Sequence, residues 1–258
     1  MLVLCAAAIS GCFLKPKPPV YAKLPVPSIQ VHDDEAMSQD GLDVTVTPIS
    51  VDNVKGFPQI EKTFAWNKTT PNASGGAAQT TGMTAKVIIL PMPAFQVRIA
   101  NNTGHIVRLT TAVFRLENNV GKKWQTFSST EELSAWKMAE LGADPNIGPD
   151  ALQQLAVQVQ AALGGLQLLT RSVELLRGDE WIGYLVFNFG GVSWADLMNN
   201  TERFTLRLAE IPVETDDAGA VSKTTEFTFV LDKASAEVDV VCPPGTKEPS
   251  WANGCTRQ

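Results

Sequence analysis

The sequence predicts a mainly β protein, an antiparallel immunoglobulin-like β-sandwich with a two-helix insertion. From residue 41 onward, apolar and polar residues alternate with a period of two over many short segments, as in strands with one buried face. Asn-, Asp- and Gly-rich turns separate these segments, which is typical of antiparallel sandwiches. A helical interval at about residues 128–172 interrupts the pattern and defines the insertion.

Three groups of residues show the strand pattern clearly, because their apolar members recur at every second position. In the first strand segment, residues 43–51, Pro48 interrupts the alternation, as an edge strand tolerates. The run at residues 181–188 is almost entirely apolar, so we expect a central strand there. The clear groups are Phe95, Val97 and Ile99; Phe204, Leu206 and Leu208; and Phe227, Phe229 and Leu231.

Two further features concern the ends of strands. The turn signal at residues 101–104 is followed by segment 106–116, in which the apolar positions change parity. A bulge near Thr110 and Thr111 would explain that change. Residues 238–240 are expected to form a last short strand.

The insertion carries start and stop signals for two helices. Ser128–Ser129 stand three residues before Glu131–Glu132, which is a capping-box arrangement, and Gly142 is a natural stop. Pro149 suits the first turn of a second helix. That helix is expected to continue to Thr170, with Gly164–Gly165 weakening it.

The second helix, residues 151–170, contains no charged residue. One interpretation is a helix that covers one end of the sandwich. The other is a docking or membrane-contact helix, because a neutral polar face is tolerated at an interface. Gln154 and Gln158 are therefore the candidate interface residues. The apolar stripe consists of Leu152, Leu155, Val159, Leu163, Leu166 and Leu169.

The first ten residues are uncharged and mostly apolar, yet too few to span a bilayer, which takes about 20 residues. They fit the apolar region of a signal peptide. The junction Ile9-Ser10-Gly11-Cys12 resembles the lipobox of bacterial lipoproteins. The resemblance implies cleavage after residue 11 and a diacylglycerol and palmitate anchor on Cys12. No Lys or Arg precedes the apolar run, so either the start codon lies upstream or the signal is atypical.

Resemblance to Gram-negative lipoproteins also suggests a location. Phe13 stands where an aspartate is associated with inner-membrane retention, which favours the outer membrane, with the protein facing the periplasm. The proline-rich stretch that follows predicts an extended, semi-rigid spacer. The expected organisation is a signal peptide (1–11), a lipidated linker (12–40), the sandwich domain (41–241) and a disulfide-closed tail (242–258).

The tail contains Cys242 and Cys255, which are expected to pair in an oxidising compartment. The disulfide would close a fourteen-residue loop and contribute about 3 kcal/mol in the chain-entropy model. Trp251 inside this loop is either a recognition residue or a side chain that packs back on its own domain.

Composition and motifs narrow the function. The net charge is −6, and no basic stripe is present, so we expect no nucleic-acid binding. With two histidines and no nucleotide-binding or hydrolase motif, we expect no catalytic residue, metal or cofactor. The first hypothesis is a non-catalytic envelope lipoprotein that binds a protein partner, as an accessory subunit of an outer-membrane assembly. The alternative is a module that binds a small molecule or cell-wall glycan on Trp66, Trp194 or Trp251, and an unrecognised hydrolase ranks third.

Overall fold

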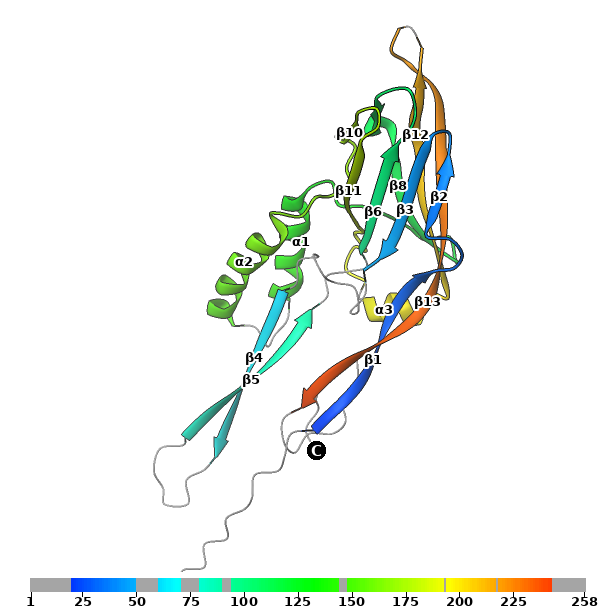
Figure 1. Cartoon of the computed structure of the whole chain (residues 1–258). Helices are drawn as coiled ribbons and strands as arrows, with labels where there is room; N and C mark the ends of the chain where they lie inside the picture. The colour runs from blue at the N-terminus through cyan, green and yellow to red at the C-terminus, as the bar shows by residue number, and fades with distance from the viewer. Residues whose placement is uncertain are drawn as a thin grey trace, which may run out of the picture. The chain divides into compact units, whose positions relative to one another are not determined.

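The computed structural model describes residues 20–49, 60–70, 79–89, 94–143, 148–192, 194–216 and 218–242. Its main strands form two sheets that pack face to face, and the chain is mainly β as predicted (Figure 1). Sheet A has the order β1-β13-β12-β8-β9, and sheet B has the order β11-β6-β3-β2. Sheet A contains β1 (Val20–Val31), β8 (Val113–Asn118), β9 (Lys123–Gln125), β12 (Arg203–Thr215) and β13 (Val221–Cys242). Sheet B contains β2 (Ala36–Gln39), β3 (Leu42–Pro48), β6 (Ala94–Asn101) and β11 (Glu180–Val186).

The order of the strands is that of an immunoglobulin-like sandwich. In chain order, β3, β6, β8, β9, β11, β12 and β13 correspond to strands A, B, C, C′, E, F and G. Strands A, B and E share one sheet, and C′, C, F and G share the other. The two-helix insertion lies between C′ and E, where a constant-type domain has strand D.

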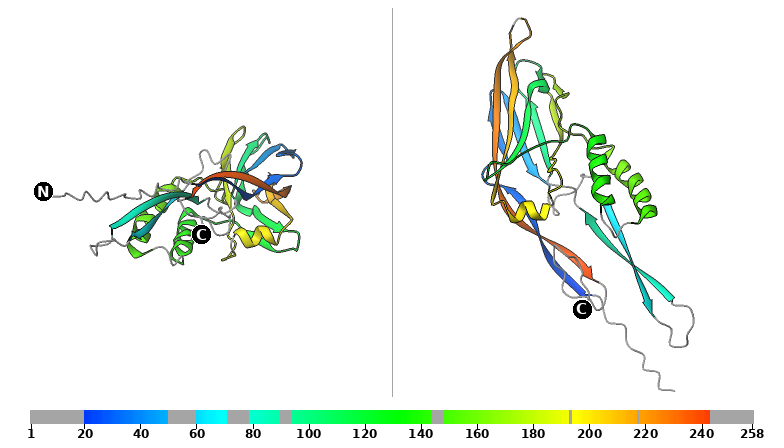
Figure 2. Two further views of the ribbon diagram at one scale, coloured as in Figure 1. Left: turned by 90° about the horizontal axis from the view of Figure 1, so that it is seen from below. Right: turned by 180° about the vertical axis from the view of Figure 1, so that it is seen from behind.

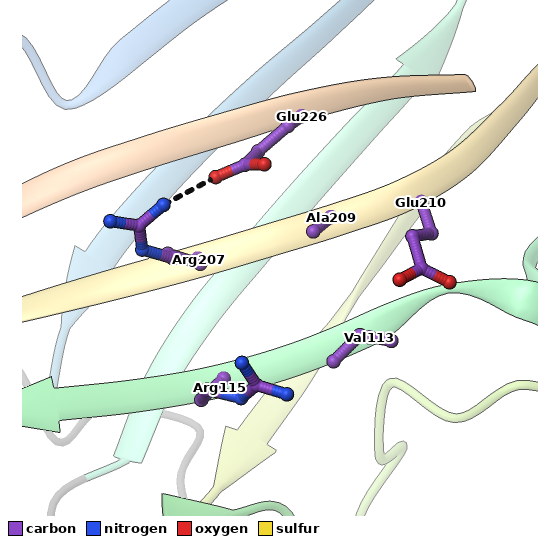
Figure 3. A pocket seen from close by; sticks show the side chains of 6 residues that line it. All are labelled: Val113, Arg115, Arg207, Ala209, Glu210 and Glu226. Atoms are coloured by element: carbon purple, nitrogen blue, oxygen red, sulfur yellow. Dashed lines mark hydrogen bonds and ion pairs between the residues drawn. The ribbon is translucent and has the colours of Figure 1, made fainter. Parts of the chain in front are cut away.

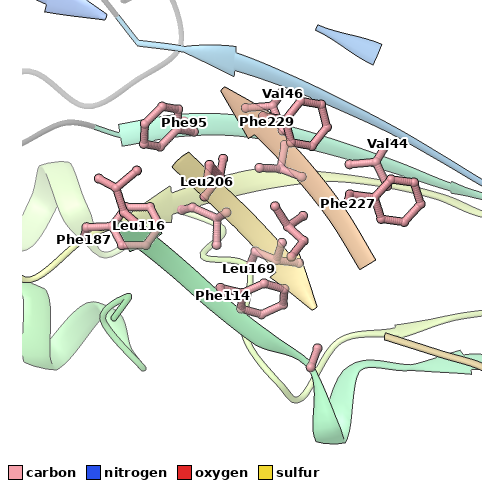
Figure 4. Close-up of a cluster of buried hydrophobic side chains, with 14 of the residues drawn as sticks. Val44, Val46, Phe95, Phe114, Leu116, Leu169, Phe187, Leu206, Phe227 and Phe229 are labelled. Carbon is pink, nitrogen blue, oxygen red and sulfur yellow. The ribbon is translucent and has the colours of Figure 1, made fainter. Parts of the chain in front are cut away.

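The core lies between the inner faces of the two sheets (Figure 4). The predicted alternation is confirmed, because the members of each clear strand group are buried and the residues between them are more exposed. Each buried phenylalanine contributes about 1.5–3 kcal/mol relative to an exposed one. The core includes Val44, Val46, Phe95, Val97 and Ile99 from sheet B, and Phe114, Leu116, Phe204, Leu206, Leu208, Phe227, Phe229 and Leu231 from sheet A.

A network of side-chain hydrogen bonds around Asn101 holds the turn predicted after β6. The side-chain amide of Asn101 is buried, and it donates to the carbonyl oxygens of His105 (2.8 Å) and Leu176 (3.0 Å). Its oxygen accepts from the Thr103 hydroxyl at 2.6 Å. The chain then enters β7 (Val107–Arg108), which pairs with β10 (Glu174–Leu175) and not with β6.

The change of parity expected from a bulge near Thr110 and Thr111 arises differently. A single 3₁₀ turn, Leu109–Thr111, joins β7 to β8. Leu109 and Ala112 are both buried at its two ends. The turn has three residues, an odd number. The buried residues therefore change from odd-numbered positions before it to even-numbered positions after it, without a bulge.

The insertion consists of α1 (Thr130–Gly142) and α2 (Pro149–Leu163), which lie side by side (Figure 2). The predicted cap is present: the Ser129 hydroxyl accepts the Glu132 N–H at 3.2 Å, while the Glu132 carboxylate accepts the Ser128 N–H at 2.9 Å. The expectation that α2 continues to Thr170 is wrong. The helix stops at Leu163 because two successive glycines follow, and residues 166–169 are not helical, with a single β-bridge from Leu168 to Tyr184.

The segment predicted as a linker is partly built into the sheets. β1 forms one edge of sheet A beside β13, and the His32 N–H donates to the Val230 carbonyl at 2.8 Å. Proline removes a donor, and edge strands accommodate it, which explains Pro25 and Pro27 in β1. Pro48 ends β3 beyond Thr45, the last residue that β2 pairs with.

Two strands differ from their predicted roles. β11 is the last strand of sheet B, not a central one, but its outer edge is partly covered: the Tyr184 N–H donates to the Gln167 carbonyl at 2.8 Å, and the Phe127 N–H donates to the Val186 carbonyl at 2.9 Å. That cover explains its apolar sequence. Residues 238–240 belong to β13, which runs continuously for 22 residues.

One hairpin lies outside both sheets. β4 (Ile60–Thr70) pairs with β5 (Gln79–Ile89) in antiparallel register, so that Trp66 lies opposite Met83. The sandwich, the hairpin and the insertion fall in one compact unit, Pro25–Val238, while the ends of β1 and β13 belong to a second unit.

Candidate functional site

The residues predicted at the two chain ends lie largely outside the described part of the chain. Cys12, Trp251 and Cys255 are all in segments that the structure does not describe. Cys242 is the last residue of β13. Lipidation of Cys12, the Cys242–Cys255 disulfide and recognition by Trp251 therefore stay predictions.

The candidate interface on α2 is described by the structure. Gln154 and Gln158 are exposed and lie one helical turn apart, so they occupy the same side of the helix. Val157 lies beside them, and 70% of it is exposed. We call this side, with the exposed residues Gln153, Gln154, Val157, Gln158, Gln160 and Ala161, the outer face of α2.

The opposite side of α2 fixes this orientation. Leu155, Val159 and Leu163 are buried in a second hydrophobic cluster, separate from the core between the sheets. Phe127 and Val186, at the ends of the strands, belong to the same cluster. The apolar stripe therefore covers one end of the sandwich, which confirms the packing interpretation for this side of the helix.

The outer face of α2 is neutral from residue 151 onward, because residues 151–170 include no charged side chain; the one charged residue of α2, Asp150, lies in its first turn. Removing an amide from water costs about 1–3 kcal/mol when it finds no hydrogen-bond partner, and a charge costs several times more. Burying an uncharged face against another protein therefore costs less desolvation free energy than burying a charged face.

The outer face of sheet A has the opposite character. Arg203 Nε donates to Asp232 Oδ1 at 3.0 Å, and Arg207 Nη1 donates to Glu226 Oε1 at 3.0 Å. His32 also bonds Asp232, and this bond, followed by that of Arg203, lowers the pKa of the Asp232 carboxyl. The charges of this face are therefore mostly neutralised by one another.

A hollow of about 210 Å³ opens on that face over β8, β12 and β13 (Figure 3). Arg115 is half-buried on one side of it and Glu210 is exposed on the other. Within the described residues, neither side chain takes part in an ion pair or hydrogen bond. The hollow is lined by Val113, Arg115, Arg207, Ala209, Glu210 and Glu226.

The sequence prediction did not include these residues. A signal was present: Phe204, Leu206 and Leu208 are buried at even-numbered positions, whereas the next large apolar residue, Ile211, is buried at an odd-numbered one. This change marks a bulge at residues 209–210. The opposition of Arg115 and Arg207 depends on the long-range register of β8 and β12, which no local pattern encodes.

We also searched the described part of the chain for a metal site, a membrane-spanning helix and a group of tryptophans that could bind a glycan. No group of three or more His, Cys, Asp or Glu residues there is close enough to hold a metal ion. No helix among these residues is long and apolar enough to cross a membrane. Trp66 lies in β4 and Trp194 begins α3 (Trp194–Asn199), so two of the tryptophans considered for glycan binding are on separate elements.

Comparison with known proteins leaves the function to be inferred from these surfaces. No protein-family model, no curated protein and no solved structure matches the chain.

Proposed function

We propose that this chain is an exported bacterial lipoprotein, anchored by lipid on Cys12, whose sandwich binds a protein partner without catalysing a reaction. In this proposal it serves as an accessory subunit of an outer-membrane assembly and faces the periplasm. The N-terminal lipobox-like junction supports the anchor. The outer face of α2 is the contact surface.

The observation that carries the partner proposal is the outer face of α2. Its exposed side chains are amides, Val157 and alanine, while the helix is held by its buried side. Charged residues are depleted at the centres of protein interfaces, because their desolvation is costly. The face thus has the composition of an interface, and it does not need to rearrange to be buried.

The same composition indicates the chemistry of the partner. Gln154 and Gln158 each offer a donor and an acceptor, and Val157 offers an apolar contact between them. A complementary surface would be uncharged, with backbone or amide groups at its rim and a small apolar depression for the valine. An acidic or strongly basic surface would leave its own charges without partners.

The test is to charge this face without disturbing the fold. The double variant Gln154→Glu/Gln158→Glu changes two exposed amides to carboxylates of nearly the same shape. Tagged full-length protein would be crosslinked in cells, solubilised and analysed by mass spectrometry. We expect the crosslinked partner of the wild-type chain to be lost, with no change in melting temperature.

The matched control is Ala135→Glu/Ala139→Glu on α1. These two positions are exposed, have the same i, i+4 spacing and add the same charge to the neighbouring helix. The control should keep the partner. Equal crosslinking by both double variants would contradict a role for the outer face of α2.

The anchor is tested in the same sample by the mass of the peptide that begins at Cys12. A diacylglycerol-modified cysteine is expected. An unmodified Cys12 that still follows residues 1–11 would overturn the lipoprotein proposal. A lipidated protein with no recurrent partner would instead favour the ligand- or glycan-binding alternative.

A further inference from the structure

The hollow on sheet A carries two opposite charges that do not meet. The Arg115 guanidinium and the Glu210 carboxylate lie on either side of Val113 (Figure 3). No ion pair joins them in the described part of the chain, although Arg207 and Glu226 in the same hollow form one at 3.0 Å. One positive and one negative group thus remain available at opposite sides of a single small site.

The register of β8 and β12 makes Arg115 unfavourable for the stability of the sheet. Arg115 on β8 lies directly opposite Arg207 on β12. Like charges at opposed positions in a sheet destabilise the pairing, and Glu226 is engaged with Arg207. Arg115 is therefore a guanidinium held next to another one without a carboxylate of its own.

The backbone conformation of Glu210 is also unfavourable for the stability of the fold. Leu208 pairs with Phe227 and Ile211 with Thr225, so Ala209 and Glu210 together oppose the single residue Glu226. Glu210 has a φ of 54°, a left-handed conformation that L-residues rarely adopt. Bulges of this kind redirect side chains and cluster at functional sites. Here the bulge places the Glu210 carboxylate over the hollow.

From these features we propose that the hollow binds a compact zwitterion of the α-amino acid class. The ligand carboxylate pairs with the Arg115 guanidinium, whose planar fork of donors matches two carboxylate oxygens. The ligand ammonium pairs with the Glu210 carboxylate. Val113 and Ala209 provide an apolar wall for a short side chain. This site uses none of the α2 residues, so it stands independently of the protein-partner proposal.

The lining also argues for a zwitterion over a simple anion. Glu210 and Glu226 would repel a second negative charge, so a phosphate dianion is disfavoured. At about 210 Å³ the hollow is smaller than the roughly 300–1,000 Å³ of drug-sized ligand pockets. It therefore suits a single amino acid or a similar small group, and we expect weak, millimolar binding because the charges are near water.

The test is a titration of the full-length chain in detergent, followed by NMR of arginine side-chain and backbone amide signals. L-alanine is the probe, and acetate, methylammonium and inorganic phosphate are tested separately. We expect saturable shifts of the Arg115 and Glu210 signals with L-alanine. Each of the other three probes should bind at least tenfold more weakly, because each satisfies one charge only or adds repulsion.

Two variants and a control complete the experiment. Arg115→Gln and Glu210→Gln should each weaken L-alanine binding at least tenfold. Arg98→Gln removes an arginine on the outer face of sheet B, where it is paired with Glu180, and should leave binding unchanged. Absence of saturable shifts with L-alanine, or equal binding of acetate alone, would overturn the proposal even if a variant failed to fold.

Discussion

The outer face of α2 and the outer face of sheet A use polar residues in different ways. On sheet A, arginines, carboxylates and His32 form ion pairs and hydrogen bonds with one another across neighbouring strands. On the outer face of α2, which follows Asp150, the exposed side chains are uncharged and point outward over a helix whose inner side is firmly packed. Apart from Arg115 and Glu210, the charges on the outer face of sheet A are thus largely paired within the protein itself, while the neutral face of α2 is the less costly one to bury.

The largest effect should come from placing a charge on the wrong side of α2. Val159 is fully buried in the insertion cluster, whereas Val157 two residues away is 70% exposed. Val159→Glu should lower the free energy of unfolding by about 3–5 kcal/mol, because it loses apolar burial and buries an unpaired charge. Val157→Glu should change it by less than about 0.5 kcal/mol. Urea denaturation of both variants measures the contrast, and similar losses would show that the outer face of α2 is itself packed.

A gain in stability is expected on the sheet face. Glu210→Gly removes the penalty of a left-handed backbone at a non-glycine residue and should raise the free energy of unfolding by about 1 kcal/mol. Thermal denaturation followed by circular dichroism measures this change. Ala209→Gly, at the neighbouring bulge position, is the control and should not stabilise. A loss of stability in Glu210→Gly would mean that the carboxylate contributes to the fold.

The ion pairs of sheet A should contribute little. A double-mutant cycle of Arg207→Gln and Glu226→Gln should give a coupling energy of about 0.2–1 kcal/mol, because both side chains are more than 40% exposed. The coupling should shrink further in 1 M salt. Urea midpoints of the four proteins provide the measurement. A coupling above about 2 kcal/mol would indicate that this pair is far less solvated than its exposure implies.

The smallest effect depends on pH. The pKa of Asp232 is lowered in the folded protein, first by His32 and then by Arg203, from an ordinary value of 3.8. Its contribution to stability is therefore present above about pH 4 and is lost as the pH falls through the lower folded value. Asp232→Asn should be less stable than the wild type at pH 6 and should approach it at pH 2–3. Parallel urea curves at these pH values that never converge would contradict this assignment.

Most strands of the sandwich could be predicted because a strand that is buried on one face alternates apolar and polar residues in its own sequence. The alternation of Phe95, Val97 and Ile99 is sufficient to identify β6, and the cap at Ser129 identifies the start of α1. The end of α2 was misjudged because the apolar stripe continues past Gly164 into a non-helical segment in which Leu166 and Leu169 are also buried.

The features that the sequence did not reveal depend on contacts between strands that are far apart in the chain. β1 reads as a proline-rich spacer, and only its pairing with β13 makes it a strand of the sandwich. In the same way, nothing local to Arg115 indicates that Arg207 lies opposite it. The outer face of α2 was predicted because it is defined by one continuous helix, whereas the hollow is assembled from three strands.

The pairing of β1 with β13 has a consequence for biogenesis. The first described strand of the chain is synthesised well before its neighbour in sheet A, with 189 residues between Val31 and Val221. At about 5–20 residues per second, the wait is roughly 10–40 s. During that time the unpaired β1 segment could pair with the wrong strand. Its prolines, which lack an N–H donor, reduce this mispairing. Sheet A can therefore close only after every intervening strand has been made, in whichever compartment the chain folds.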